Sequence, residues 1–289
     1  MKIANQPAGT FSRRMILAAA GIGWPAFAQS ETYETHAKGI RILPGQWRPH
    51  YPFEQIVWIS PSWPSQDYIW LDFPEAIFSD QGLLYLSHVN PAITPLFPDL
   101  PKIPWRAILG GLSFDRRLPN GVSFGGSVIK KSGSVVELEL HLHNGSPAPL
   151  THITLQTCAY LRGIKEFADF TRDNKFVHLP SGWVRLSEAL AARKSEPASY
   201  RVGWRTKGRP IADRPVLVTV SNQPQRLVAM TWHKDTLSLI ANPNHPCMHA
   251  DPQFKDLAPG ERASIRGHIL FFEGSLPEFD LEKDLRPPG

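Results

Sequence analysis

Residues 242–252 concentrate side chains that can do chemistry. The segment holds two histidines, one cysteine and one aspartate among three prolines. An imidazole titrates near neutral pH and a carboxylate beside it tunes that titration, so His249 and Asp251 are predicted to be a catalytic acid–base pair. The prolines predict a rigid loop that holds both side chains still. The alternative is a structural turn whose histidine and aspartate bind the local backbone.

A second group of ionisable side chains lies in residues 135–143. Glu139, His141 and His143 occupy alternate positions, and a two-residue period puts them on one face of a strand. They are predicted to contact a substrate. Imidazoles at i and i+2 can also chelate zinc, copper or iron, with a third ligand from Glu139, His152 or a distant loop. A solvated polar face is the simpler alternative.

Aromatic and basic residues provide candidates for binding a sugar. Trp63 lies between prolines in a loop-like stretch, and an indole there can stack on the apolar face of a sugar ring. Trp58 and Trp70 lie in strand-like runs, where packing in the core is expected. Arg162 and Lys175 are predicted to meet an acidic group of a glycan, with solvated surface cations as the alternative.

The elements that position these residues are predicted to be short strands. Runs of β-forming residues alternate with Gly, Pro and Asn, which is typical of an all-β sandwich of the supersandwich or jelly-roll type. The expected strands are 55–59, 67–73, 83–89, 105–115, 121–130, 135–143, 150–160, 216–220, 227–232, 236–241 and 263–272. Two short helices, 165–171 and 186–193, are expected in a long excursion between strands. We expect one domain over 55–289, preceded by a surface arm over 29–54.

Residues 135–160 predict a hairpin of neighbouring strands. One face is expected to be buried, and it comprises Leu138, Leu140, Leu142, Ile153 and Leu155. The polar faces of both strands should then be continuous, and the loop 242–252 is expected to line the same concavity. The segment 135–160 has alternating Val and Leu, then Asn-Gly-Ser in the turn, then Pro-Leu at the start of the next strand. It resembles the central hairpin of galactose-mutarotase-like supersandwiches. That resemblance implies a carbohydrate-active β-sandwich.

The resemblance covers about residues 120–160 and stops after the hairpin. Epimerases of that family continue with a Gly-His-x-Tyr-Phe type motif, where this chain has Thr-Cys-Ala-Tyr-Leu-Arg-Gly over residues 157–163. No catalytic residue is therefore transferred from the family.

The N-terminus is typical of an export signal. Arg13 and Arg14 precede an apolar stretch that ends in Ala-Phe-Ala at residues 26–28. This resembles a twin-arginine signal peptide over residues 1–28, cleaved before Gln29. The resemblance implies a periplasmic or secreted protein that is exported folded, without a membrane anchor after cleavage. No cofactor follows from it.

Charge and missing motifs exclude several classes. The chain of 289 residues has a formal charge of +5, but residues 1–28 carry three bases and no acid, which leaves 28 bases against 26 acids. The bases are scattered, so a nucleic acid is not an expected partner. No phosphate-binding loop, dinucleotide fingerprint or G-x-S-x-G motif occurs.

Three functions remain from the sequence. The favoured one is an exported protein that modifies a glycan by proton transfer, as a lyase, epimerase or hydrolase. The alternatives are a non-catalytic glycan-binding or assembly module and a strand-borne metal oxidoreductase. Whether Cys158 and Cys247 pair is left open.

Overall fold

The computed structural model describes residues 38–45, 55–90, 92–161, 163–167, 173–191, 200–203, 212–222, 225–241 and 246–285. The predicted signal peptide, most of the arm 29–54 and Arg162 lie outside the described residues.

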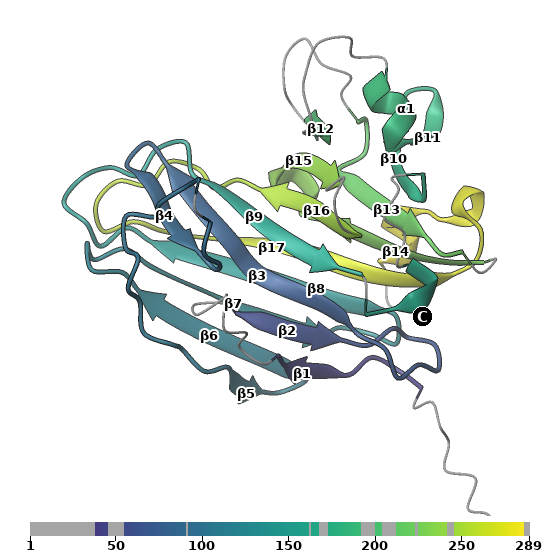
Figure 1. Ribbon diagram of the computed structural model, residues 1–289, viewed down its shortest axis with the longest axis horizontal. Helices are drawn as coiled ribbons and strands as arrows, with labels where there is room; N and C mark the ends of the chain where they lie inside the picture. Colours follow the sequence, from purple (N-terminus) through teal and green to yellow (C-terminus); the bar gives the residue numbers. More distant parts are fainter. Residues whose placement is uncertain are drawn as a thin grey trace, which may run out of the picture. The chain divides into compact units, whose positions relative to one another are not determined.

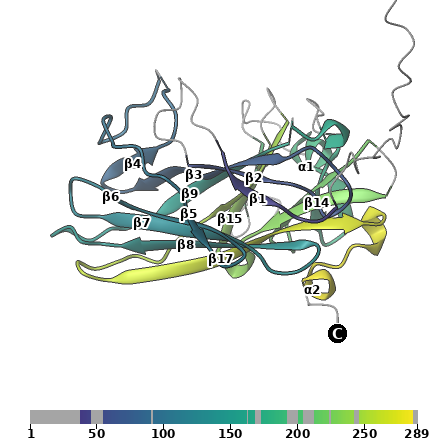
Figure 2. The same cartoon turned by 90° about the horizontal axis from the view of Figure 1, so that it is seen from below.

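Two antiparallel sheets form the domain, as Figures 1 and 2 show. The eight-stranded sheet has the order β1-β2-β3-β9-β16-β15-β12, and β4 pairs with β3. Its strands are β1 (Ile42–Pro44), β2 (Ile56–Ile59), β3 (Ile69–Ser79), β4 (Gly82–Leu86), β9 (Thr154–Tyr160), β12 (Tyr200–Gly203), β15 (Thr236–Ala241) and β16 (Cys247–Pro252). The predicted all-β sandwich is confirmed.

The nine-stranded sheet has the order β11-β10-β13-β14-β17-β8-β7-β6-β5. Its strands are β5 (Arg106–Ile108), β6 (Gly111–Arg117), β7 (Ser123–Lys130), β8 (Val135–His143), β10 (Lys175–Leu179), β11 (Gly182–Arg185), β13 (Val216–Val220), β14 (Arg226–Thr231) and β17 (Arg262–Glu273). The helical pieces are η1 (Lys165–Phe167), α1 (Leu186–Ala191), η2 (His233–Asp235), η3 (Leu276–Glu278) and α2 (Leu281–Asp284). None of them, in the part of the chain described, is long and apolar enough to cross a bilayer.

The core lies between the sheets, because alternate residues of both sheets point inward. The five residues predicted to be buried in 135–160 are all at most 2% exposed and belong to one core cluster. A smaller cluster on the outer side of the nine-stranded sheet includes Val218, Leu270 and Leu281. The C-terminal segment that carries α2 therefore covers part of that outer side, as Figure 2 shows.

The predicted hairpin over 135–160 is wrong. β8 pairs with β7 and β17, whereas β9 pairs with β3 and β16 in the other sheet. Residues 144–153 thus carry the chain from one sheet to the other. Alternation alone cannot distinguish the two arrangements, because leucines that face a common core can come from neighbouring strands or from opposite sheets.

The predicted loop 242–252 is also wrong over most of its described part. Cys247–Pro252 forms β16, a strand buried between β9 and β15, and residues 242–245 lie outside the described residues. Met248 and Ala250 are the inward residues of an ordinary two-residue alternation. The alternate residues His249 and Asp251 are polar, so the segment has the composition of a loop. Within the predicted surface arm, Ile42–Pro44 forms β1 at the sheet edge.

The two sheets approach each other closely at Gly126 of β7. A methyl group on its Cα would lie 2.6 Å from Cε1 of Phe73, which projects from β3 of the opposite sheet. The Phe73 ring is fully buried and stacks on Trp232 with 6.2 Å between ring centroids. Glycine is needed here for the close approach of a side chain to the backbone.

Candidate functional site

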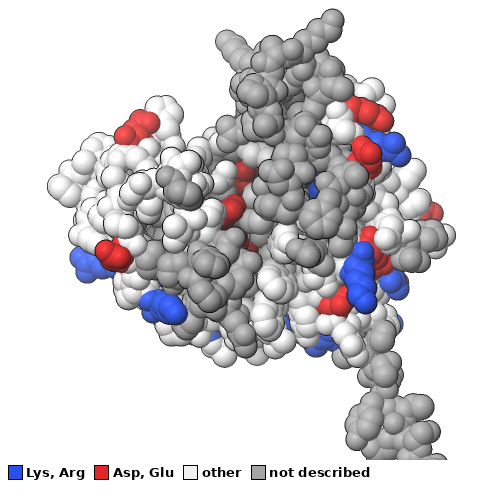
Figure 3. Space-filling model, viewed as in Figure 1, with Lys and Arg blue, Asp and Glu red and all other residues white. Residues whose placement is uncertain are grey.

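The outer face of the eight-stranded sheet, called the front face below, carries a cluster of acids, imidazoles and thiols. Met248 of β16 and Ala159 of β9 point into the core, so their neighbours on each strand point to the front face. The acid–thiol cluster comprises Asp72, Glu75, His88, Cys158, Cys247, His249 and Asp251. Figure 3, drawn in the view of Figure 1, shows acidic side chains inside a depression near the centre of this face.

His249 lies between two carboxylates. Its Nδ1 is 3.5 Å from Oδ1 of Asp251 and 3.7 Å from Oε2 of Glu75. The backbone amide of Thr157 donates a hydrogen bond of 3.2 Å to Oδ1 of Asp251. Burial opposes charge on His249, but the negative charges of Cys247 and Asp251 outweigh it and raise the pKa of His249 well above its ordinary value. These contacts favour a protonated imidazole beside Glu75.

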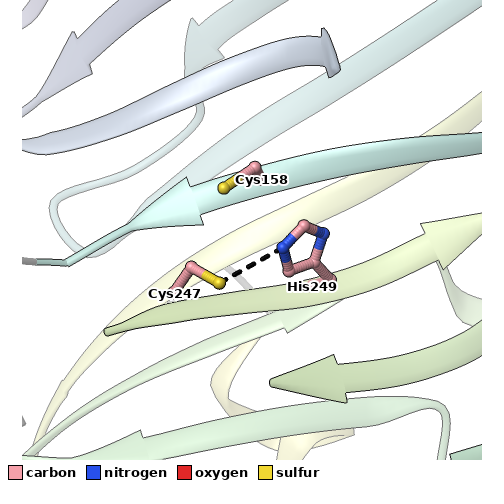
Figure 4. Close-up of side chains that lie close together, drawn as sticks. All are labelled: Cys158, Cys247 and His249. Carbon is pink, nitrogen blue, oxygen red and sulfur yellow. Dashed lines mark hydrogen bonds between the residues drawn. The ribbon is translucent and has the colours of Figure 1, made fainter. Parts of the chain in front are cut away.

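The other ring nitrogen of His249 points to the thiols. Nε2 is 3.3 Å from Sγ of Cys247, and Cys158 comes from the adjacent strand β9, as Figure 4 shows. No disulfide joins the two cysteines. Contact with Cys247, burial and the charge of Glu75 raise the pKa of the Cys158 thiol well above its ordinary value.

Glu75 links this group to a second one. Asp72, Glu75 and His88 bring one ligand atom each within 4.8 Å of one another, and His88 Nδ1 is 3.9 Å from Glu75 Oε1. Ser87 donates a hydrogen bond of 2.5 Å to Asp72. The side chain of Glu75 is 19% exposed, whereas that of Asp251 is 2% exposed. Glu75 is therefore the more accessible of these two carboxylates.

A row of aromatic side chains adjoins the cluster. The ring centroids of Trp58 and Trp70 are 6.1 Å apart, and those of Trp70 and Tyr160 are 6.2 Å apart. Tyr68 packs against Trp58 at 6.3 Å. All four side chains are partly exposed, and Tyr160 pairs with Cys247 in the sheet register. The core position expected for Trp58 and Trp70 is therefore wrong; these four residues are called the aromatic row.

Trp63, in contrast, is 1% exposed. Its ring meets Phe271 edge-on at 5.6 Å and Phe167 at 6.0 Å, and the Arg226 guanidinium lies 4.9 Å above it. The expected exposed platform at Trp63 is wrong, because packing of these side chains leaves no free ring face for a sugar.

The polar residues of β8 lie on the outer face of the other sheet. His141 Nε2 is 2.8 Å from Asp115, and Glu139 accepts a hydrogen bond of 3.2 Å from Arg266. The core separates them from His249, so the expected convergence with the predicted loop is wrong. His141 and His143 line a pocket with Asp115, but neither belongs to a group of described residues with three ligand atoms in metal-binding range.

Lys175, a predicted glycan contact, is fully buried in β10 of the nine-stranded sheet. Its Nζ donates a hydrogen bond of 2.9 Å to Asn174. The prediction for Lys175 is therefore corrected, and the one for Arg162 lies outside the described residues.

The sequence interpretation missed Glu75, His88 and Asp72. A signal was present, because Asp72 and Glu75 interrupt an otherwise apolar strand, β3. Charged residues in a buried strand need partners or a function.

The fold and site together define a two-sheet antiparallel β-sandwich with a polar cluster on one outer face. No known protein family and no curated protein matches the chain. Among solved structures, a GalM/aldose epimerase homologue from C. elegans covers 83% of this chain and all of its own, at 11% identity and a TM-score of 0.42. Galactose 1-epimerase from Lactobacillus acidophilus covers 83% of this chain and all of its own, at 9% identity and a TM-score of 0.38. Similarities this distant assign neither an activity nor a substrate.

Proposed function

We propose that this chain is an exported protein that modifies a carbohydrate by proton transfer on the front face, with Glu75 as the group that takes the proton. One observation carries the proposal: a partly exposed carboxylate lies between two imidazoles, 3.9 Å from His88 and 3.7 Å from His249, beside a row of aromatic rings. General acid–base catalysis needs this combination of groups within reach of each other.

The aromatic row supports a carbohydrate as the substrate class. Sugar rings have apolar C–H faces that stack on Trp and Tyr, whose polar atoms remain available for hydrogen bonds. Tyr160 pairs with Cys247 of the cluster. Trp70 pairs with Tyr160 and lies two positions before Asp72 on β3. A sugar stacked on them would place its ring hydroxyls and C–H groups toward Glu75.

The roles within the cluster follow from exposure. Glu75 and His88 have side chains 19% and 23% exposed, so we assign proton removal to Glu75 and proton return to His88. His249 and Asp251, predicted from the sequence as the catalytic pair, are nearly buried. We assign them as positioning residues: protonated His249 faces Glu75 and compensates its charge, and Asp251 orients the His249 ring.

Proton removal and return suit epimerisation or elimination better than hydrolysis. Glycoside hydrolysis generally needs two carboxyl groups that flank the scissile bond. Here Asp72 and Asp251 are 6% and 1% exposed, which leaves Glu75 as the cluster's only carboxylate with substantial exposure.

The experiment incubates purified protein in D₂O with a panel of free aldoses and with uronate-containing polysaccharides. Proton NMR follows anomer conversion, deuterium incorporation at carbon and the formation of unsaturated products. We expect Glu75→Gln to lower turnover by about 10²–10⁴-fold. Glu282→Gln, the same change at an exposed position on α2, should leave it unaltered. Unchanged turnover in Glu75→Gln would contradict the proposal.

Glu139→Gln separates the two faces of the sandwich. We expect full turnover in this variant, because Glu139 lies on the other sheet. Loss of turnover there with retention in Glu75→Gln would move the site to β8.

A non-catalytic glycan-binding module is the second candidate, and the aromatic row alone favours it. Such a module would bind a sugar equally well with Glu75→Gln but would lose binding with Trp70→Ala. It would show no turnover with any member of the panel.

A further inference from the structure

We propose that Cys158, Cys247 and His249 form a binding site for a zinc ion. The two thiols and the imidazole come from adjacent strands, β9 and β16, and all three residues are less than 9% exposed. One ligand atom from each lies within 4.8 Å of the other two. Thiolate and imidazole are the ligands that zinc prefers in proteins. This inference does not rest on the proposed carbohydrate chemistry.

The spacing of the atoms agrees with coordination. Zinc bonds of about 2.3 Å to sulfur and 2.0 Å to nitrogen in a tetrahedron place a sulfur and a nitrogen ligand about 3.5 Å apart. Sγ of Cys247 and Nε2 of His249 are 3.3 Å apart. The dashed line in Figure 4 marks this contact. Small rotations of side chains would suffice to admit the ion. Three protein ligands leave the fourth position to a water molecule or an outside ligand.

The opposite side of the His249 ring provides independent support. Its buried Nδ1 makes no hydrogen bond in the described part of the chain, although Asp251 and Glu75 lie 3.5 and 3.7 Å away. A histidine that binds a metal through one nitrogen generally presents the other N–H to a carboxylate, which fixes the tautomer and orients the ring. Here Nε2 faces the thiols and Nδ1 faces two carboxylates.

Charge balance also favours a divalent ion. When zinc binds, the two thiols lose their protons and His249 binds as the neutral imidazole. Two thiolates then neutralise the two positive charges of zinc, which matters in a buried site where uncompensated charge is costly. His249 keeps the Nδ1 proton that faces Asp251 and Glu75.

The register of the strands argues against a disulfide as the purpose of the cysteines. Cys247 pairs with Tyr160 and Met248 with Ala159, so continuation of this register places Cys158 opposite His249. The two cysteines are then diagonal neighbours, for which Cα atoms are typically about 7–8 Å apart. Disulfides usually need less than about 7 Å.

The test uses the full chain, reduced and treated with a chelator. Zn²⁺ is titrated in competition with a chromophoric chelator, and Co²⁺ is added to a second sample as a spectroscopic substitute. We expect one Zn²⁺ per chain, and a thiolate-to-cobalt charge-transfer band in the near ultraviolet. Cys158→Ser and Cys247→Ser should each weaken zinc binding by at least about 100-fold and reduce that band, because each removes a direct ligand.

Two further variants distinguish neighbouring explanations. Asp251→Asn keeps all three ligands and should weaken zinc binding by about 10–100-fold. His88→Gln removes a member of the other ligand group, Asp72–Glu75–His88, and should leave the cobalt band intact. Circular dichroism checks that each variant folds, and the cobalt spectrum of the unmodified chain needs no variant.

Three results would overturn the zinc site. The first is the absence of a charge-transfer band in the unmodified, reduced chain. The second is zinc affinity that is unchanged in both cysteine variants. The third is an intact mass showing that the thiols join as a disulfide in the isolated protein, combined with no zinc binding after reduction.

Discussion

His233 of η2 and His268 of β17 lie within hydrogen-bond distance of each other, which only certain protonation states allow. His233 Nε2 and His268 Nδ1 are 2.7 Å apart, so the pair cannot hold a proton on both of these atoms. Burial and the neighbouring His233, with smaller effects of Lys131 and Arg266, lower the pKa of His268 to about 4, although Glu137 acts in the opposite direction. Burial also lowers the pKa of His233.

This pair predicts a loss of stability in mild acid. The ordinary pKa of 6.5 applies to the unfolded chain and a pKa of about 4 to folded His268, so the unfolded state binds more protons as the pH falls from 6.5 to 4. The contribution of neutral His268 to the free energy of unfolding is complete above pH 6.5. It is lost as the pH falls from 6.5 to 4, by up to about 3 kcal/mol. Urea unfolding at several pH values measures it.

His268→Gln should lack this part of the pH dependence, whereas His152→Gln, at a position 81% exposed, should retain it. The free energy of unfolding of His268→Gln should therefore approach or exceed that of the unmodified chain at low pH. Parallel curves for the unmodified chain and His268→Gln would show that the pair carries no such effect.

At the scale of single residues, the sequence indicates some of the candidate site residues but not which of them are in contact. His249 and Asp251 stand out because polar residues cluster around them, and the structure indeed places them together. Glu75 comes from a strand more than 170 positions earlier in the printed sequence, and local patterns contain no information about that contact. The predicted exposures of Trp63 and Trp70 are the reverse of those in the structure. The burial of a single ring depends on its neighbours in space, such as Phe271 beside Trp63.

Strand β8 shows how much a local pattern can establish about an element. Its bounds, Val135–His143, and its alternation of buried and partly exposed positions match the expectation. The predicted partner does not match, since β8 pairs with β17, with Val135 opposite Leu270 and His143 opposite Arg262. The connection over residues 144–153 takes the chain from β8 into the other sheet. In it, Asn144 is buried and donates hydrogen bonds to the carbonyls of Ala148 and Leu257.

The two faces of β8 should respond differently to truncation. Leu140→Ala removes a side chain that is 1% exposed and should lower the free energy of unfolding by about 2–5 kcal/mol, through lost apolar burial and a cavity. His141→Ala removes a side chain 40% exposed, and its partner Asp115 stays solvated, so about 1 kcal/mol or less is expected. Chemical denaturation measures both, and equal losses would contradict the assignment of faces.

At the scale of the whole molecule, composition sufficed for the class of fold. A chain rich in proline, glycine and aromatic residues, with many short β-forming runs, folds as two packed antiparallel sheets. The order of strands does not follow from composition, because the seventeen strands of the described residues can be arranged in many ways with similar burial. Strands β10 and β16 are absent from the predicted strands. For β16 the reason is composition, because His249, Asp251 and Pro252 give it the residues of a loop.

Export is a prediction about the whole chain. The arginine pair and the Ala-Phe-Ala site predict that the mature protein begins at Gln29 and that combined Arg13→Lys and Arg14→Lys substitutions abolish export. Intact-mass measurement of periplasmic protein checks the first point, and fractionation of the double variant checks the second. Residues 1–28 still attached to the periplasmic protein would refute the cleavage.

The close approach of the sheets at Gly126 has a consequence for which sequence changes the molecule tolerates. Phe73 fits against β7 because residue 126 lacks a side chain, and Phe73 stacks on Trp232, whose indole is 3.4 Å from Thr157 Oγ1. The Thr157 amide in turn holds Asp251. A chain of contacts therefore links Gly126 of the nine-stranded sheet to Asp251 on the front face. Relatives that keep the same cluster should retain glycine at 126, or change residues 73 and 126 together.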